Sequence, residues 1–141
     1  MLNDVPRGTQ GASGRPVSFE PRTVLLTLPW PPSTNKIWRA VAGRIILAKL
    51  ARAYKARLAA ALPSGPVRPL MGRLVVWMTL HAPEKIGPVF DIANREKLLF
   101  DTLTQQRVWG DDSQIDCLTI VRGTPDAGKG YVELAIREVA P

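Results

Sequence analysis

The chain has 141 residues, 22% of them charged, a formal net charge of +7, a pI near 10.2 and one cysteine. This length suits a single domain, and one cysteine excludes an intrachain disulfide and any multi-cysteine zinc site. No apolar run reaches the roughly 20 residues that span a bilayer, and the N-terminus lacks the apolar core of a signal peptide, so we expect a cytoplasmic protein whose positive charge favours a nucleic-acid partner.

Residues 1–21 are rich in Gly, Pro, Ser and Arg and contain little to bury. This composition predicts a flexible basic tail ahead of one domain over residues 22–141. The next segment, Thr23–Leu28, is apolar and β-branched and is stopped by a proline, as expected of a strand. A proline-rich run follows over residues 29–38 and predicts an extended loop, in which the two tryptophans are expected to be buried anchors ahead of base-stacking residues.

Apolar residues recur with a helical period over residues 46–62, which predicts a helix there. Its other faces carry positive charge with no interleaved Asp or Glu, so phosphate contact and plain solvation are equally expected. The candidate DNA-binding residues in and before this helix are Lys36, Arg39, Lys49, Arg52 and Lys55.

Three further apolar segments predict strands. Leu74–Leu80 is continuously apolar and is expected in the middle of a sheet, with His81 as a hydrogen-bonded structural residue. Residues 114–122, which contain Cys117 as an expected core residue, and residues 131–138 are interpreted as two strands joined as a hairpin. The resulting order β-α-β-α-β-β predicts the α/β class, with α+β as the variant, and a single mixed sheet covered by two helices.

Carboxylates are concentrated in one region of this basic chain. Residues 1–83 carry twelve Lys/Arg and two acids, whereas six of the twelve acids lie between Asp91 and Asp116. Carboxylates repel phosphates, so a group of acids in a chain expected to bind phosphates needs a physical explanation. Mg²⁺ supplies one, because it is bound by one or two protein carboxylates together with substrate phosphate oxygens.

The local pattern can bring these groups together. Asp91 is suited to cap a helix from about Ile92 to Gln106, which would place Asn94, Lys97 and Asp101 on one face. Asp111 and Asp112 follow in the turn after that helix. They would return toward its start only if the next strand pairs beside it.

These residues carry a family resemblance. The stretch from Asp91 to Asp112 resembles the RusA family of Holliday-junction resolvases, whose signature is an aspartate-x-aspartate-asparagine run, a lysine one turn on and an aspartate pair after an aromatic-rich turn. The run Leu28-Pro29-Trp30-Pro31-Pro32-Ser33-Thr34-Asn35 is similar to the one that opens RusA-like domains. The positions that match without a gap are Asp91, Asn94, Lys97, Phe100, Asp101, Leu103, Trp109, Asp111 and Asp112.

The resemblance implies a bacterial or phage-encoded homodimer that binds four-way DNA junctions and makes paired Mg²⁺-dependent nicks, with Mn²⁺ as a substitute ion. It implies that Asp91 and Asp112 hold the metal with Asp111 close by, and that Lys97 stabilises charge on the phosphoryl oxygens. Asp101 matches by position and ranks below them, as an acid that can equally be structural. Lys85 and Arg95, around the first aspartate, complete the expected DNA-binding set.

One position departs from the family pattern. Ala93 stands where the family carries its second aspartate, and a methyl group cannot ligate a metal. We therefore expect impaired cleavage with DNA binding retained, either in an engineered inactive form or in a natural variant. A non-enzymatic nucleic-acid-binding module and an endonuclease for other branched DNA stay open as alternatives.

Overall fold

The computed structural model describes residues 18–65 and 68–141, so most of the predicted tail lies outside the described residues. A four-stranded mixed sheet forms the body, in the order β1-β6-β4-β5. Its strands are β1 (Thr23–Pro29), β4 (Arg73–His81), β5 (Ile115–Arg122) and β6 (Tyr131–Ala140). β4 pairs parallel with β5 and antiparallel with β6, which confirms its predicted central place.

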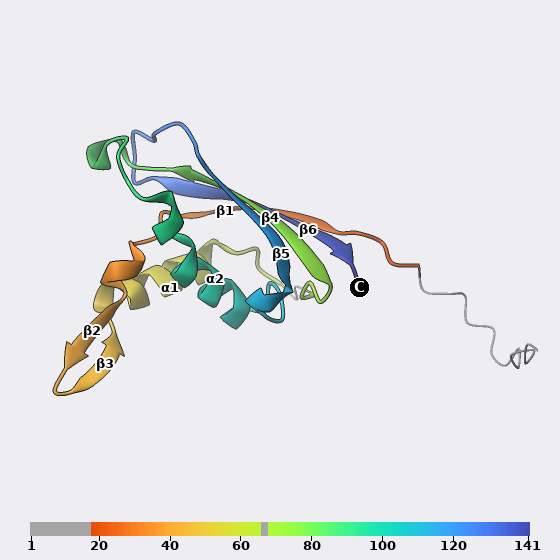
Figure 1. Ribbon diagram of the computed structural model, residues 1–141, viewed down its shortest axis with the longest axis horizontal. Coiled ribbons are helices and arrows are strands. Elements are labelled where there is room, and N and C mark those ends of the chain that lie inside the picture. The colour runs from red at the N-terminus through yellow and green to blue at the C-terminus, as the bar shows by residue number, and fades with distance from the viewer. Residues whose placement is uncertain (1–17, 66–67) are drawn as a thin grey trace, which may run out of the picture.

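Both α-helices cover the same face of this sheet (Figure 1). They are α1 (Lys49–Ala61) and α2 (Glu96–Gln105). Every second residue of β4 (Leu74, Val76, Met78 and Leu80) is buried beneath them, as expected for a sheet with one face on the core. The predicted fold class, a mixed sheet covered by two helices, is confirmed. Among the described residues, no helix combines the length and apolarity that a membrane crossing requires.

A small hairpin that the sequence did not predict precedes α1. It consists of β2 (Trp38–Val41) and β3 (Arg44–Leu47), which form a two-stranded sheet of their own. Ala42 and Gly43 both have positive φ angles, 50° and 76°, as the tightest hairpin turns require. The helix predicted from Ile46 therefore begins only at Lys49, because the β-branched residues before it pair across this turn.

The last two strands are not the hairpin that was predicted. β4 lies between β5 and β6, so the loop over residues 123–130 crosses the end of β4. This loop is fixed there by two backbone hydrogen bonds, from Asp126 N to Ala82 O at 2.8 Å and from Glu84 N to Asp126 O at 2.9 Å. Since β4 can pair on both edges, it separates strands that are neighbours in sequence.

None of the described helices covers the other face of the sheet, which we call the uncovered sheet face. Cys117 pairs with Val75 on this face and is exposed, so its prediction as a core residue was wrong. Strand alternation decides this, because an apolar strand at the sheet edge still points every second residue away from the helices. His81, predicted as a structural residue, is buried and its Nδ1 lies 2.8 Å from the carbonyl oxygen of Thr124.

Candidate active site and nucleic-acid interface

The acidic stretch does not form one continuous helix. A short 3₁₀ turn, η3 (Ile92–Asn94), comes first, and Arg95 breaks it from α2. Asp91 caps η3 instead of a long helix, because its Oδ1 accepts a 3.0 Å hydrogen bond from Ala93 N. The predicted helix over residues 92–106 was therefore wrong in its first turn.

Asn94 explains the break. Its carbonyl oxygen accepts a 3.1 Å hydrogen bond from Thr34 Oγ1, and its side-chain amide donates a 2.7 Å bond to Ser33 Oγ. Because the Asn94 carbonyl accepts this hydrogen bond from the loop, it points away from the backbone hydrogen bonds of α2. The proline-rich loop and the acidic stretch, the two segments that carry the sequence resemblance, are thus in direct contact, and Asn94 does not share a helix face with Lys97.

Lys97 and Asp101 form an ion pair on the first turns of α2, with Nζ 3.0 Å from Oδ1. The hydrogen bond that Lys97 donates to Asp101 is the main cause that raises the pKa of Lys97, and the negative charge of Asp112 adds to it. Lys97 therefore stays protonated at neutral pH. The turn after α2 therefore carries Asp112 to within electrostatic reach of Lys97.

The second aspartate pair is held by a capping box. Asp111 accepts from Ser113 N at 3.1 Å, and Gln114 Oε1 accepts from Asp111 N at 2.7 Å, around the turn η4 (Asp112–Gln114). Hydrogen bonds from Ser113 hold the pKa of the Asp111 carboxyl below its usual value. The buried Gln114 also donates to Leu70 O and Gly72 O, which fixes η4 against the residues just before β4.

Two of the predicted metal ligands each lie near a basic side chain. Asp112 lies within electrostatic reach of Lys97, and Asp91 lies within reach of Arg95. Within residues 18–65 and 68–141, no three His, Cys, Asp or Glu side chains form a group that could hold a metal ion. Ala93 is exposed between Asp91 and Asn94, so the position that would enlarge the acidic group presents a methyl.

A cationic cavity of about 540 Å³ lies beside this stretch. We call it the basic groove; its charged lining residues are Lys36, Arg57, Lys85, Arg95 and Lys129, with no acid among the lining residues. The Arg95 guanidinium lies over the Trp30 ring, 5.1 Å from its centroid, and donates a 3.0 Å hydrogen bond to Pro31 O. Such a groove suits a phosphate backbone.

Sequence reasoning found Lys36, Lys85 and Arg95 of this groove but not Arg57 or Lys129. Arg57 comes from α1 and Lys129 from the loop that crosses β4, so no sequence spacing links them. The other predicted cations lie outside the groove. Arg39 is in β2, and Lys49, Arg52 and Lys55 are on α1, where Arg52 also donates to Leu47 O.

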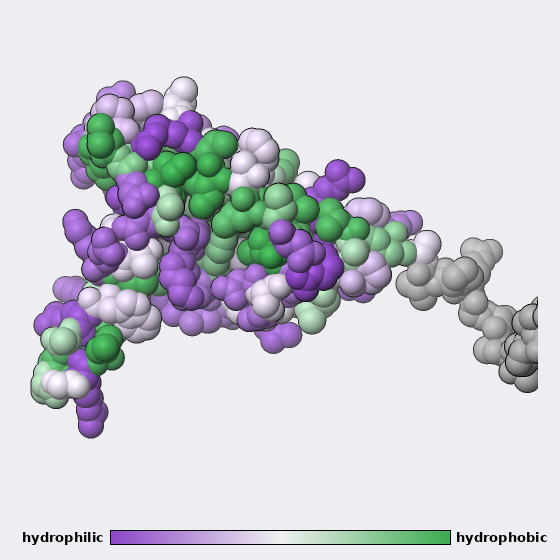
Figure 2. All heavy atoms as spheres, viewed as in Figure 1, coloured by the Kyte–Doolittle hydropathy of each residue, from purple (hydrophilic) through white to green (hydrophobic). Residues whose placement is uncertain are grey.

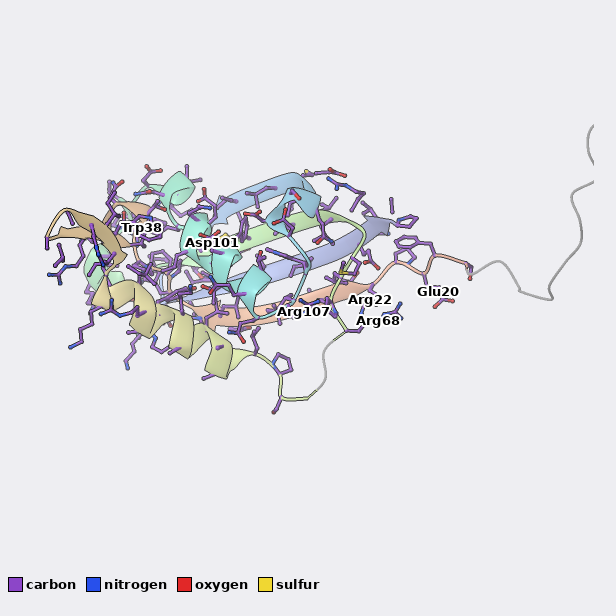
Figure 3. The ribbon with its side chains drawn as sticks, turned by 90° about the horizontal axis from the view of Figure 1, so that it is seen from below. Glu20, Arg22, Trp38, Arg68, Asp101 and Arg107 are labelled. Atoms are coloured by element: carbon purple, nitrogen blue, oxygen red, sulfur yellow. The ribbon has the colours of Figure 1, made fainter. Side chains whose placement is uncertain are left out.

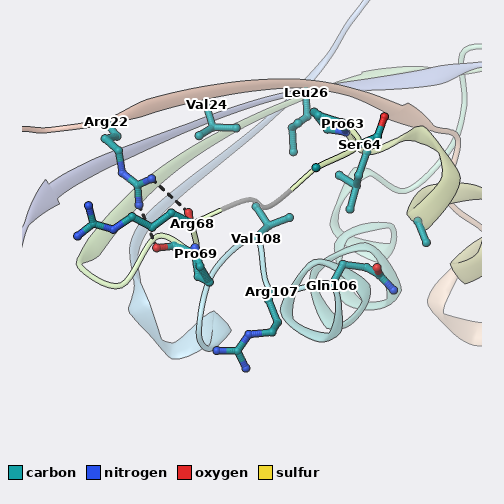
Figure 4. A pocket seen from close by; sticks show the side chains of 13 residues that line it. Arg22, Val24, Leu26, Pro63, Ser64, Arg68, Pro69, Gln106, Arg107 and Val108 are labelled. Atoms are coloured by element: carbon teal, nitrogen blue, oxygen red, sulfur yellow. Dashed lines mark hydrogen bonds between the residues drawn. The ribbon is translucent and has the colours of Figure 1, made fainter.

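A second cavity of about 840 Å³ lies beyond the C-terminal end of α2, toward the other end of the domain from Trp38 (Figure 3). Three arginines border it (Figure 4): Arg22, Arg68 and Arg107. Arg22 Nη2 donates a 2.9 Å hydrogen bond to Pro69 O, so this side chain is already engaged in the fold. No acid is among the described residues that line this cavity.

Comparison with known proteins decides the family. A family profile described as Endodeoxyribonuclease RusA matches residues 29–137. The chain belongs to the RusA family. Crossover junction endodeoxyribonuclease RusA of Escherichia coli strain K12 is 33% identical over 122 residues, which cover 83% of this chain and 96% of that relative. The enzymes of the same name from Shigella sonnei and from Enterobacteria phage 82 are 32% identical over the same shares.

Proposed function

We propose that this protein is a structure-specific endodeoxyribonuclease that resolves four-way DNA junctions by paired symmetric nicks with the help of Mg²⁺. The observation that carries the proposal is family membership over nearly the whole length of relatives named crossover junction endodeoxyribonucleases. The basic groove supports it, because Arg95, one of its lining residues, lies within electrostatic reach of Asp91.

The donor set suits a hard divalent ion. Asp91, Asp111 and Asp112 offer carboxylate oxygens, and Mg²⁺ needs only one or two of these when phosphate oxygens and water complete its shell. We propose that Asp91 and Asp112 hold the ion with Asp111 close by, and that Mn²⁺ can replace it. When bound, such an ion polarises the scissile phosphate and lowers the pKa of an attacking water.

Lys97 supplies the positive charge of the proposed site. Its ion pair with Asp101 fixes the ammonium group, and the raised pKa keeps it charged through the neutral range. A fixed cation beside the phosphoryl oxygens stabilises the negative charge that builds in the transition state. Asp101 is then a positioning residue that acts through Lys97.

Ala93 is the reason to expect that this chain binds junctions better than it cuts them. With alanine at this position, the acidic group has one metal-ligating carboxylate fewer than the family pattern. It also has one negative charge fewer next to the proposed path of the phosphates. Cleavage should therefore be slow while affinity for DNA holds or rises. The same observation favours the second candidate function, a nucleic-acid-binding module without catalytic activity.

We also propose a homodimer, since a two-fold substrate cut at two symmetric points calls for one site in each protomer.

The uncovered sheet face suits a second copy. Leu25 and Trp77, 75% and 51% exposed, flank the small residue Ala135 in one row across β1, β6 and β4. Glu133 and Arg137 lie on either side of Ala135. A two-fold axis through Ala135 would place Glu133 of each copy opposite Arg137 of the other.

The experiment that tests the function restores the missing carboxylate. Ala93→Asp should raise the Mg²⁺-dependent cleavage of a labelled four-way junction by about a hundredfold or more, since a lost ligand costs orders of magnitude in rate. Ala93→Asn is the matched control, because it has the same shape without the charge. Asp91→Asn or Lys97→Ala in the Ala93→Asp background should abolish the gain.

Three outcomes have distinct meanings. If Ala93→Asp binds the junction and still does not cut it with Mg²⁺ or Mn²⁺, the protein is a binding module. If it cuts flapped or three-way substrates in preference to four-way junctions, the substrate assignment is wrong. If cuts appear without a divalent ion, the proposed role of the acidic stretch is wrong.

A further inference from the structure

The β2–β3 hairpin, residues 38–47, projects from the body as a ribbon of its own (Figure 1). Its strand residues other than Leu47 are exposed, including Trp38 at 55% and Ile45 at 76%. Hydrophobic and hydrophilic residues alternate over its surface (Figure 2). A lone two-stranded hairpin is only marginally stable in water, and exposed indole and sec-butyl groups do not help to keep it soluble. These side chains therefore point to a binding partner.

The root of the hairpin is fixed relative to the acidic stretch. Ala48 N donates a 2.9 Å hydrogen bond to Ile37 O, which closes the base of the ribbon, and Ile37 is buried. A few residues earlier, Ser33 and Thr34 make the hydrogen bonds to Asn94. Whatever the ribbon contacts is therefore placed at a set distance from Asp91.

The positive charge on and around the hairpin favours an anionic binding partner. No Asp or Glu occurs between residues 21 and 83, so the hairpin and α1 carry only positive charge. The register pairs Val41 with Arg44 and Arg39 with Ile46, which puts both arginines on one face; Trp38 and Ile45 lie on the other face. One face thus offers two cations beside Val41 and Ile46, and the other offers apolar area without charge.

The apolar face distinguishes the branch point from a duplex arm. Four residues of strand reach about 13 Å, enough to pass from the phosphate backbone to the bases. Apolar side chains cannot read the hydrogen-bonding edges of bases, but they pack well against base faces. In continuous duplex those faces are covered by stacking, whereas strand exchange at a four-way junction leaves them accessible.

We infer that the β2–β3 hairpin is the branch-point contact of this protein, with Trp38 and Ile45 against unstacked bases and Arg39 and Arg44 on the flanking phosphates. The inference rests on the proposed function, because it assumes the junction as substrate. The hairpin supplies selectivity for junctions over duplex DNA, and the basic groove supplies affinity for both.

The test compares binding to a four-way junction and to a linear duplex of the same arm sequence, in Ca²⁺ so that no strand is cut. Trp38→Ala and Ile45→Ala should each weaken junction binding about tenfold, the scale of one lost stacking contact, and change duplex binding less than twofold. Met71→Ala, an exposed apolar residue before β4, is the matched control and should change neither. Arg39→Gln should weaken binding to both DNAs and lower the salt slope by about one.

A measurement on the wild-type chain covers the case of a variant that misfolds. Emission of Trp38, isolated as the difference between wild type and Trp38→Phe, should be quenched by the junction and not by the duplex. Equal loss of junction and duplex affinity in Trp38→Ala would overturn the inference in favour of a groove contact. Loss of self-association in sedimentation, with junction selectivity intact, would overturn it in favour of a contact between copies. If the wild type does not prefer the junction at all, the proposed function fails instead.

Discussion

The side-chain amide of Asn94 donates a 2.7 Å hydrogen bond to the hydroxyl of Ser33, and the carbonyl of Asn94 accepts from Thr34. These two bonds join the proline-rich loop to the acidic stretch across sixty residues of sequence. They also interrupt the helix after η3, so that Asp91 caps a short turn beside Ala93. Asn94 is therefore a positioning residue.

Asn94→Ala should lower the free energy of unfolding by about 1 kcal/mol, the usual net value of a side-chain hydrogen bond, as measured by urea denaturation. In the Ala93→Asp background it should also lower the cleavage rate without abolishing junction binding. Asn35→Ala, in the exposed part of the same loop, is the control. Equal stability of the two variants would show that the bond to Ser33 does not position the stretch.

The basic groove should hold DNA through residues that the sequence did not single out. Arg57→Gln and Lys129→Gln should each reduce junction affinity and lower the slope of log K against log salt by about 0.9, the value for one phosphate contact. Arg107→Gln, which borders the second cavity, is a charge-matched control (Figure 4). A loss of the same size in the control would mean that only net charge matters.

The capping carboxylate of Asp111 should give stability that depends on pH. Its pKa is lowered in the fold, so its contribution is present above the unfolded value of about 3.9 and is lost as pH falls through the folded value. Asp111→Asn keeps a cap that does not titrate. We expect wild type to be more stable than Asp111→Asn at neutral pH, with the difference vanishing in strong acid, as followed by thermal unfolding. A constant difference would contradict the lowered pKa.

The uncovered sheet face should carry the dimer. Trp77→Glu places a charge in the row beside Ala135 and should shift the protein to monomer in analytical ultracentrifugation. Glu133→Arg should have a similar effect, and the pair Glu133→Arg with Arg137→Glu should restore association. A dimer that survives Trp77→Glu must use another surface.

Much of the fold could be predicted because its signals are local. The four main strands were found from β-branched runs and turn residues, and α1 from a stripe that the structure narrows to Ala51, Tyr54 and Leu58. Trp30 is a buried anchor as predicted, whereas Trp38 is exposed because the chain turns into β2 there. The hairpin was not predicted because Ala42 adopts a positive φ angle, which is uncommon for an alanine.

The site was harder to predict because its parts meet only in three dimensions. The coupling of Lys97 to Asp112 depends on the turn after α2, and the basic groove combines α1, the proline-rich loop and the loop that crosses β4. The sequence could name the acidic residues and three of the groove cations. It could not show that Asn94 faces Ser33 instead of Lys97.

The pairing of β1 with β6 sets an order of assembly. Within the part of the chain that the structure describes, β1 comes before every other strand, and its partner in the four-stranded sheet is β6, which comes after them. During synthesis β1 therefore cannot pair within this sheet until β6 has left the ribosome. The entropy cost of closing this long loop comes before the stabilisation that strand pairing provides. A nascent chain of this protein would thus present its arginines to nucleic acid before it has a finished core, and any hold on DNA gained then would come before the ability to choose among DNA shapes.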